Sequence, residues 1–148
     1  AAGPHRSEAA VRAGVPQVVS VGAVDMVNFG APETVPEQFT GRNFYRHNPT
    51  VTLMRTTVDE NIAIASTLAE KLNMAQHPGR TVLLLPRKGV SMLDAEGQAF
   101  YGPAEDEALF HTLQEKIDPT EIVMMDSHIN DKVFAQAAAE RLVQMMEA

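Results

Sequence analysis

The sequence predicts an α/β fold, a three-layer Rossmann-like sandwich with a mainly parallel sheet. Three short apolar runs, at 15–23, 81–85 and 121–125, have the composition of buried strands. Segments with helical spacing of apolar residues alternate with them, which implies parallel β-α units with right-handed crossovers. The 148 residues are enough for one domain with a full core, so we take 1–148 as a single domain.

The first part of the chain contains a short helix, the first buried strand and a long connection. Ser7 is placed to cap a helix over 7–13, and Gly14 is placed to end it. After the strand, residues 22–48 show no clear period. A connection of that length is typical of a functional loop, and it has room for a short strand at 42–47.

The middle helix has the clearest start signal. Thr57 and Glu60 form the pattern of a capping box, and apolar residues at helical spacing continue to about Ala75. The residues before it, 51–54, are expected to form either a short strand or an extended entry to the helix.

Two further helices complete the alternation. Apolar residues between Leu109 and Ile117 mark one helix, which leads into the third buried strand. Asn130 or Asp131 caps the last helix, in which Phe134 begins an apolar face.

Composition excludes several classes of protein. The chain has 12 Lys and Arg against 19 Asp and Glu, a net charge of -7, which argues against nucleic-acid or membrane partners. It has no cysteine, so disulfides, zinc-thiolate sites and cysteine nucleophiles are excluded. No apolar run reaches the ~20 residues of a membrane span, and no signal peptide is visible. We therefore expect a cytoplasmic protein.

An acid-free window stands out in this acidic chain. Residues 38–58 contain no Asp or Glu but include Arg42, Arg46, His47 and Arg55. Guanidinium groups match the oxygens of phosphate or carboxylate, and threonine hydroxyls add neutral donors. The window therefore indicates an anion site, or else a loop whose arginines pair with acids elsewhere in the fold.

Polar residues also follow each predicted strand. Ligands of open parallel sheets bind outside the carboxyl ends of the strands, so these residues would face one crevice. Each has a structural alternative: a helix cap, a packed histidine or a solvated turn. The residues are Asp25 and Asn28 after the first strand, Arg87, Lys88, Ser91 and Asp94 after the second, and Asp126, His128, Asn130 and Asp131 after the third.

Motifs for common cofactors are absent. The chain has no G-x-G-x-x-G, no P-loop pattern and no G-x-S-x-G, so a standard dinucleotide, P-loop or serine-nucleophile site is not supported. Asp25, Asp126, His128 and Asp131 could bind magnesium, but their spacing matches no metal motif and we predict no metal site.

Several long and unusual strings occur along the chain, at residues 15–30, 34–37, 41–43, 47–57, 89–91 and 128–131. These strings resemble a known family, the Tm-one-like ATP-binding proteins, which are uncharacterised bacterial and fungal proteins related to the tomato mosaic virus resistance protein. The resemblance covers nearly the whole chain but only the C-terminal part of a family protein.

The resemblance implies that the chain is most of the second of two Rossmann-like domains, without its N-terminal domain. It associates a nucleotide mainly with that other domain, and magnesium could accompany it in the full-length protein. No ATP contact is carried onto this chain. The partner that the resemblance implies is the missing N-terminal domain. We also expect a small-molecule anion and a further copy of the chain in a homo-oligomer as partners.

We therefore predict a site for a phosphorylated or carboxylated small molecule at the C-terminal edge of the sheet. The sequence does not decide whether the domain is an enzyme. The alternative is a non-catalytic module for protein interaction or self-association, built on the aromatic loop 39–45. The acid–base candidates are His128 and Asp126, and the ligand-binding candidates are Asp25, Asn28, Arg42, Asn43, His47, Arg55, Thr56, Arg87, Ser91 and Asn130.

Overall fold

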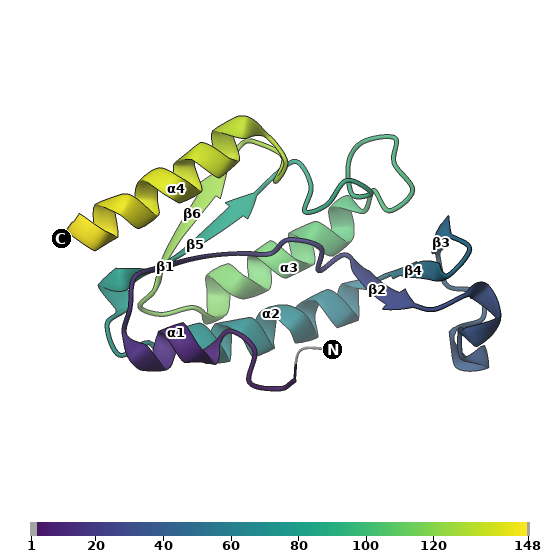
Figure 1. Ribbon diagram of the computed structural model, residues 1–148, viewed down its shortest axis with the longest axis horizontal. Coiled ribbons are helices and arrows are strands. Elements are labelled where there is room, and N and C mark those ends of the chain that lie inside the picture. Colours follow the sequence, from purple (N-terminus) through teal and green to yellow (C-terminus); the bar gives the residue numbers. More distant parts are fainter. Residues whose placement is uncertain (1–2, 148) are drawn as a thin grey trace.

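The computed structural model describes residues 3–147 and has the predicted three layers (Figure 1). A parallel sheet with strand order β1-β5-β6 forms the middle layer. The predicted α/β class with a parallel sheet is confirmed. The strands are β1 (Gln17–Ser20), β5 (Thr81–Pro86) and β6 (Glu121–Met125).

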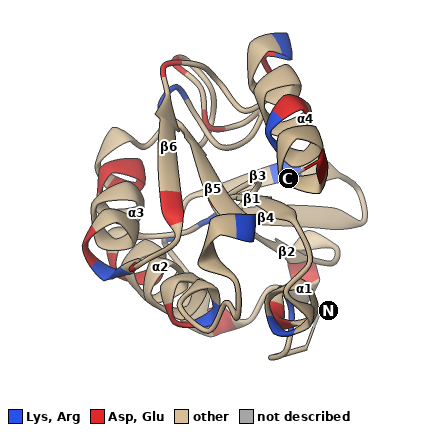
Figure 2. Ribbon diagram, turned by 90° about the vertical axis from the view of Figure 1, so that its left-hand side faces the viewer, with Lys and Arg blue, Asp and Glu red and all other residues tan. Residues whose placement is uncertain are grey.

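Helices cover both faces of this sheet (Figures 1 and 2). One face carries α1, α2 and α3, and the other carries α4. Because side chains alternate along a strand, Leu83 and Leu85 of β5 belong to the core under α2 and α3, whereas Val82 and Leu84 face Phe134 of α4. The helices are α1 (Glu8–Ala13), α2 (Val58–Leu72), α3 (Pro103–Lys116) and α4 (Lys132–Glu147).

The central position of β5 explains its sequence. All six residues of β5 are buried, as expected for a strand with neighbours on both edges and helices on both faces. The strand observed within the apolar run 15–23 is β1, which is shorter than the run and only partly buried. Among the described strands β1 has a single neighbour, β5, so an apolar run predicted too deep a burial for it.

A second, antiparallel sheet occupies what the sequence indicated as a long loop. Its order is β2-β4-β3, and in Figure 1 it extends beyond the parallel sheet. The strand predicted near 42–47 is confirmed as β3, but β2 was not predicted. The strands are β2 (Met26–Phe29), β3 (Phe44–Asn48) and β4 (Val51–Arg55), with single turns of 3-10 helix at Pro32–Thr34, Glu37–Phe39 and, before β5, Pro78–Arg80.

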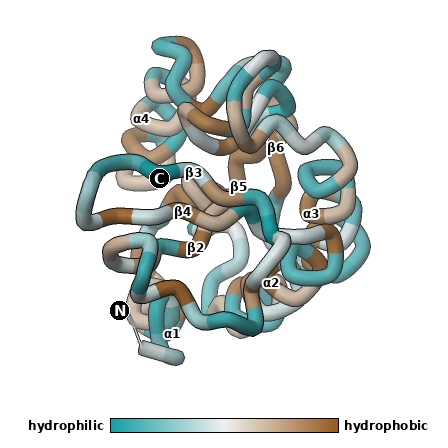
Figure 3. Tube along the Cα trace, turned by 90° about the vertical axis from the view of Figure 1, so that its right-hand side faces the viewer, coloured by the Kyte–Doolittle hydropathy of each residue, from teal (hydrophilic) through white to brown (hydrophobic). Residues whose placement is uncertain are grey.

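The surface pattern explains why this second sheet is hard to predict. Every residue of β3 is exposed, so β3 has no apolar face to give a period of two. Figure 3 shows the hairpin of β3 and β4 in mixed hydropathy. The aromatic residues are partly used internally, since Tyr45 lies 6.3 Å from Phe100 and Phe29 lies 5.4 Å from Phe39 between ring centroids.

The predicted helix ends are partly confirmed. Thr57 Oγ1 accepts a hydrogen bond from the Glu60 N–H at 3.2 Å, and the Glu60 carboxylate accepts one from the Thr57 N–H at 2.8 Å. The predicted capping box is therefore present. Gly14 ends α1 with φ 64°, but the prediction for Ser7 is wrong, because its side chain caps no helix N–H. Before α4, Asp131 Oδ2 accepts a hydrogen bond from the His128 N–H, in the loop that precedes the helix.

None of the helices described between residues 3 and 147 has both the length and the apolar character needed to span a membrane.

Candidate functional site

Arg55, the last residue of β4, is the centre of a buried polar cluster. Its side chain is 6% exposed. One terminal nitrogen lies 3.3 Å from an oxygen of Asp94 and 3.1 Å from an oxygen of Asp106, and it donates to the Gly102 carbonyl at 3.3 Å. A side chain on Gly102 would collide with this guanidinium, since an added Cβ would stand 2.6 Å from it. Arg55 is thus enclosed by acids from the loop after β5 and from α3.

Asp25 adds a third carboxyl to this cluster. It is fully buried, and its Oδ2 accepts from the Ser91 hydroxyl at 2.6 Å, while its Oδ1 has no hydrogen-bond partner in the described chain. Burial raises the pKa of Asp25, and the Ser91 hydrogen bond and the Arg55 charge oppose that shift. Asp25 is therefore held in an environment that favours its neutral form.

The cluster has more acids than bases. Asp25 and Asp94 are 0% exposed and Asp106 is 8% exposed, against one guanidinium from Arg55. Burial, the hydrogen bond with Asp94 and the charge of Asp94 raise the pKa of Asp106 to about 7, although Arg55 opposes the shift. Carboxyls this close titrate as a coupled group, and near neutral pH the cluster retains a proton.

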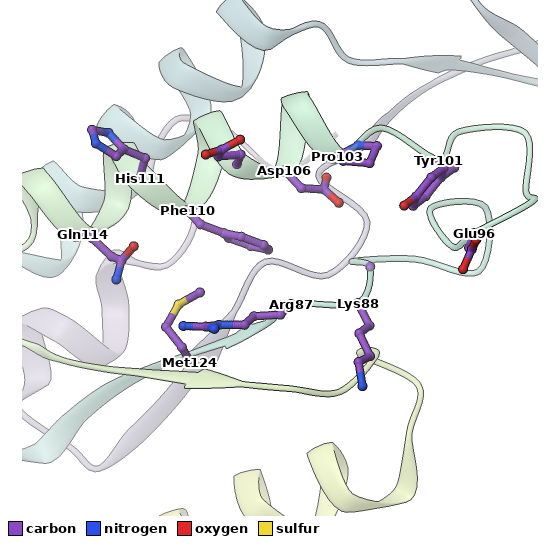
Figure 4. A pocket seen from close by; sticks show the side chains of 12 residues that line it. Arg87, Lys88, Glu96, Tyr101, Pro103, Asp106, Phe110, His111, Gln114 and Met124 are labelled. Atoms are coloured by element: carbon purple, nitrogen blue, oxygen red, sulfur yellow. The ribbon is translucent and has the colours of Figure 1, made fainter.

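A cleft of about 750 Å³ lies beside this cluster, at the carboxyl ends of β5 and β6. Figure 4 shows Asp106 and Phe110 projecting from α3 towards the strands, with Tyr101 at one end. Arg87 extends beneath Phe110 towards Met124. The remaining lining residues are Lys88, Gly89, Glu96, Pro103, Glu107, His111 and Gln114.

Arg87 and Lys88 behave differently in this cleft. Lys88 points away from Arg87 in Figure 4 and contacts Asp126, with 3.1 Å between Nζ and Oδ2. The Arg87 side chain is exposed, and within residues 3–147 no carboxylate oxygen lies within 4.0 Å of its guanidinium nitrogens. Arg87, which the sequence predicts as a ligand-binding residue, thus presents an unpaired guanidinium to the cleft.

The backbone that carries Arg87 is fixed by hydrogen bonds to the end of β6 and to the loop after it. The Arg87 N–H donates to the Met125 carbonyl at 2.9 Å, and the Lys88 N–H donates to the Ser127 carbonyl at 3.1 Å. In the other direction, the Ile129 N–H donates to the Gly89 carbonyl at 3.1 Å. The loops after β5 and β6 are therefore joined along their first turns.

Gly89 is required where the two loops meet. Its φ is 123°, a conformation that residues with a side chain rarely adopt. An added Cβ would also stand 1.8 Å from the Asp94 carbonyl oxygen. The close contact places the backbone of Asp94 directly behind Gly89, which lines the cleft.

A smaller cavity of about 250 Å³ gathers four of the predicted ligand-binding residues. Arg42, Asn43, Arg55 and Thr56 all line it. The arginines are already engaged, however, since Arg42 donates to the Glu60 carboxylate at 3.1 and 2.6 Å and Arg55 is enclosed as described above. For these two residues the structure favours the alternative in which they pair with acids elsewhere in the fold.

The neutral members of this group also have partners. The Asn43 amide donates to the Ala99 carbonyl at 3.0 Å, and Thr56 Oγ1 donates to the Val24 carbonyl at 3.0 Å while accepting from Asn61 at 3.0 Å. The hydrogen bond and charge of Arg42 lower the pKa of Glu60.

The two acid–base candidates from the sequence do not line the cleft. His128 Nδ1 accepts from the Asn130 N–H at 3.1 Å, so Nε2 carries the proton and donates to the Ser91 carbonyl at 2.9 Å. Both ring nitrogens therefore hold the loop backbone. Asp126 is exposed and contacts Lys88. Their roles in acid–base chemistry stay predictions.

Five predicted ligand-binding residues line neither cavity. Two of them, Asp25 and Ser91, belong to the buried cluster around Arg55. Asn28 and His47 belong to β2 and β3 of the antiparallel sheet, and the exposed Asn130 lies in the loop before α4. In residues 3–147 no three His, Asp or Glu side chains are grouped around a point that could hold a metal ion.

Sequence reasoning missed Asp106, Tyr101 and Phe110. Asp106 lies in the first turn of α3, where an acid is ordinarily explained by the helix dipole. Its burial results from Arg55, 51 residues earlier in the chain, and no local signal in the sequence reveals that pairing.

Comparison with known proteins places these features in a family context. The model of the family described as "Uncharacterised protein family (UPF0261) C-terminal domain" matches residues 1–146. A UPF0261 protein of Clostridium tetani is 57% identical over 148 residues, which are 99% of this chain and 36% of that protein. A UPF0261 protein of Rhizobium meliloti is 52% identical over 136 residues, 90% of this chain and 34% of that protein.

A plant protein is also similar. The "ToMV susceptible protein tm-1(GCR26)" of Solanum lycopersicum is 43% identical over 143 residues, 95% of this chain and 19% of that protein. The chain thus spans about a third of the length of the two bacterial relatives and a smaller share of the plant relative.

Proposed function

The chain belongs to the UPF0261 family, and on that premise we propose that it binds a phosphorylated or carboxylated small molecule in the cleft at the carboxyl ends of β5 and β6. The resemblance to Tm-one-like proteins is confirmed by the tomato relative. In full-length relatives the cleft would be completed by the other domain. A nucleotide or magnesium ion in the full-length protein stays a prediction.

The free guanidinium of Arg87 carries this proposal. It is exposed in a cleft of about 750 Å³ and has no carboxylate partner within residues 3–147. A guanidinium binds phosphate or carboxylate oxygens through two parallel hydrogen bonds. The position also obeys the rule that open parallel sheets bind ligands outside their carboxyl edge.

The start of α3 supports the same site. Pro103 is the first residue of α3 and lines the cleft, and no side chain caps this helix end. The positive end of the helix dipole therefore favours negative charge there. Glu96 and Glu107 also line the cleft, and their repulsion would confine the anion to the side of Arg87.

Anion binding by matched variants tests the proposal. Thermal unfolding of the full-length protein is followed with sulfate, sugar phosphates and dicarboxylates, since a ligand of the folded state raises the melting temperature by mass action. We expect the shift to vanish in Arg87→Gln and to persist in Lys88→Gln, which removes an equal charge that points elsewhere. An Arg87→Gln protein that binds as well as the unmodified one would exclude this site.

A second candidate function rests on the exposed strand β3. All five of its residues are exposed, including Phe44 and Tyr45, and within the described chain only β4 pairs with it. Such an edge can accept another strand, as in a homo-oligomer or a protein complex. Light scattering of the full-length protein would test it: a Tyr45→Lys variant with an unchanged mass distribution would argue against β3 as the interface.

A further inference from the structure

We propose that Asp106 is the proton-transferring residue of the cleft, so that the cleft binds a dianion together with one proton. This inference rests on the proposed function and specifies its ligand class. The dianion would be a phosphate monoester or a dicarboxylate, of which one charge meets Arg87 and the other meets the Asp106 carboxyl group.

The position of Asp106 is the first argument. Of the three buried carboxyls around Arg55, Asp106 alone lines the cleft, because Asp25 and Asp94 are 0% exposed. Its Oδ1 lies 3.1 Å from Arg55, and no donor of residues 3–147 binds its Oδ2. In Figure 4 the carboxyl group projects from α3 into the space above Arg87 and Lys88. Asp106 thus connects the buried cluster to the cleft.

The balance of charge is the second argument. A dianion in the cleft would meet one unpaired cation, Arg87, and two acids, Glu96 and Glu107. The other basic side chains that line the cleft among residues 3–147 have acidic partners: Lys88 points away and contacts Asp126, and His111 lies 3.3 Å from Glu115. A neutral, protonated Asp106 removes one repulsion and adds a donor, and carboxyls crowded in a buried site keep such a proton.

The proton transfer is balanced within these residues. The O–H bond of Asp106 breaks, its electron pair stays on the carboxylate, and the ligand oxygen gains the proton. The new charge lies 3.1 Å from the Arg55 guanidinium, which stabilises it. In the reverse direction Asp106 accepts a proton from the ligand. Arg55 and Asp94 act through Asp106 and are positioning residues, because neither reaches the cleft ligand in this scheme.

Other charged groups belong to the elements packed around Asp106. Arg55 comes from β4, Asp25 follows β1, and Asp94 and Glu96 belong to the loop after β5. Glu105, Glu107 and His111 lie on α3 itself, and Arg87 and Lys88 follow β5. Of these only Arg55 contacts the Asp106 carboxyl as a cation. Besides burial, Asp94 and Arg55 therefore determine the pKa of Asp106.

Sulfate is the probe for the test, because it mimics a phosphate dianion and does not titrate between pH 5 and pH 9. Binding to the full-length protein is measured by calorimetry at pH 6 and pH 8, in buffers with different heats of ionisation. We expect uptake of close to one proton at pH 8 and an affinity roughly ten times lower there than at pH 6. Asp106→Asn should bind without proton uptake and with no pH dependence.

The outcomes separate the two proposals. Sulfate binding that needs Arg87 but exchanges no proton would overturn the role of Asp106 and leave the anion site standing. An absence of binding at both pH values would overturn the anion site and this inference with it. The carbon-13 shift of the Asp106 carboxyl gives a reading that needs no variant: its titration midpoint should rise when sulfate is added, and an unchanged midpoint would contradict the inference.

Discussion

Arg55 and Arg87 each stand at the carboxyl end of a strand, yet their surroundings are opposite. Arg55 is 6% exposed and is held by Asp94 and Asp106. Arg87 is exposed in the cleft and has no acid within 4.0 Å among the described residues. The first arginine is used to hold the fold, and the second is free to bind.

The difference shows how local charge can mislead. The acid-free window 38–58 contains Arg42 and Arg55, and the acids that neutralise them lie outside it. Glu60 is 18 residues from Arg42, and Asp94 is 39 residues from Arg55. A basic window therefore indicates an anion site only when the fold brings no carboxylate to it.

Removal of Arg55 should have the largest effect. Arg55→Met would leave Asp94 and Asp106 buried without a counter-charge, and breaking a buried pair costs about 3–5 kcal/mol. Denaturation by urea would measure the loss in free energy of unfolding. Arg87→Met is the matched control, and as a surface change it should stay within about 0.5 kcal/mol. Equal losses in the two variants would remove the distinction between the two arginines.

Gly89 lines the cleft and packs against the backbone of Asp94, and it should be the next most sensitive position. Gly89→Ala combines a left-handed backbone with a Cβ 1.8 Å from the Asp94 carbonyl oxygen, and we expect a loss of about 3 kcal/mol. Gly97 also has a positive φ, 80°, but open space around it. Gly97→Ala should therefore cost only about 1 kcal/mol. A mild effect at Gly89 would mean that the loop can move away from the cleft floor.

Because the cluster has more carboxyl groups than cations, we expect the stability of the folded protein to depend on pH. Asp106 has an ordinary pKa of 3.8 and a pKa of about 7 in the fold, so between these values the folded state binds the proton and the unfolded state does not. Its contribution to stability is complete below pH 3.8 and is lost as the pH rises through about 7. Asp106→Asn should therefore melt higher than the unmodified protein at pH 8, with a smaller difference at pH 5.

Thermal unfolding of both proteins at pH 5 and pH 8 measures this difference. Groups other than Asp106 titrate in both proteins and largely cancel. A difference that is constant with pH would show that Asp106 is ionised throughout, and the buried cluster would then hold its proton elsewhere.

The partly exposed pair of Arg42 and Glu60 should matter least. Because the pair is close to water, Arg42→Met is expected to cost about 0.5–1 kcal/mol, compared with nearly none for Arg46→Met in the exposed strand β3. Since the pKa of Glu60 is lowered, its contribution is present above its ordinary pKa and fades as the pH falls through the folded value. Urea denaturation at pH 7 and pH 4 would compare the two variants, and a larger loss at pH 4 would contradict this account.

How much the sequence predicts depends on how local each signal is. The apolar run of β5 and the capping box of Thr57 and Glu60 are local patterns, and the structure confirms both. The strand β2 was missed because its four residues, two of them exposed, are too few to show an alternation. The buried carboxyl of Asp106 was missed because its partners come from other elements, at separations that local patterns do not encode.

The hydrogen bonds between the loops after β5 and β6 have a consequence for the thermodynamics of binding. Donors on Arg87, Lys88 and Ile129 fasten one loop to the other, so the backbone that carries Arg87 is ordered before any ligand arrives. Because this backbone is already ordered, ligand binding avoids most of the conformational entropy loss that ordering a flexible loop would cause. The amide protons of these three residues should therefore exchange slowly in the free protein and change little when the cleft is filled.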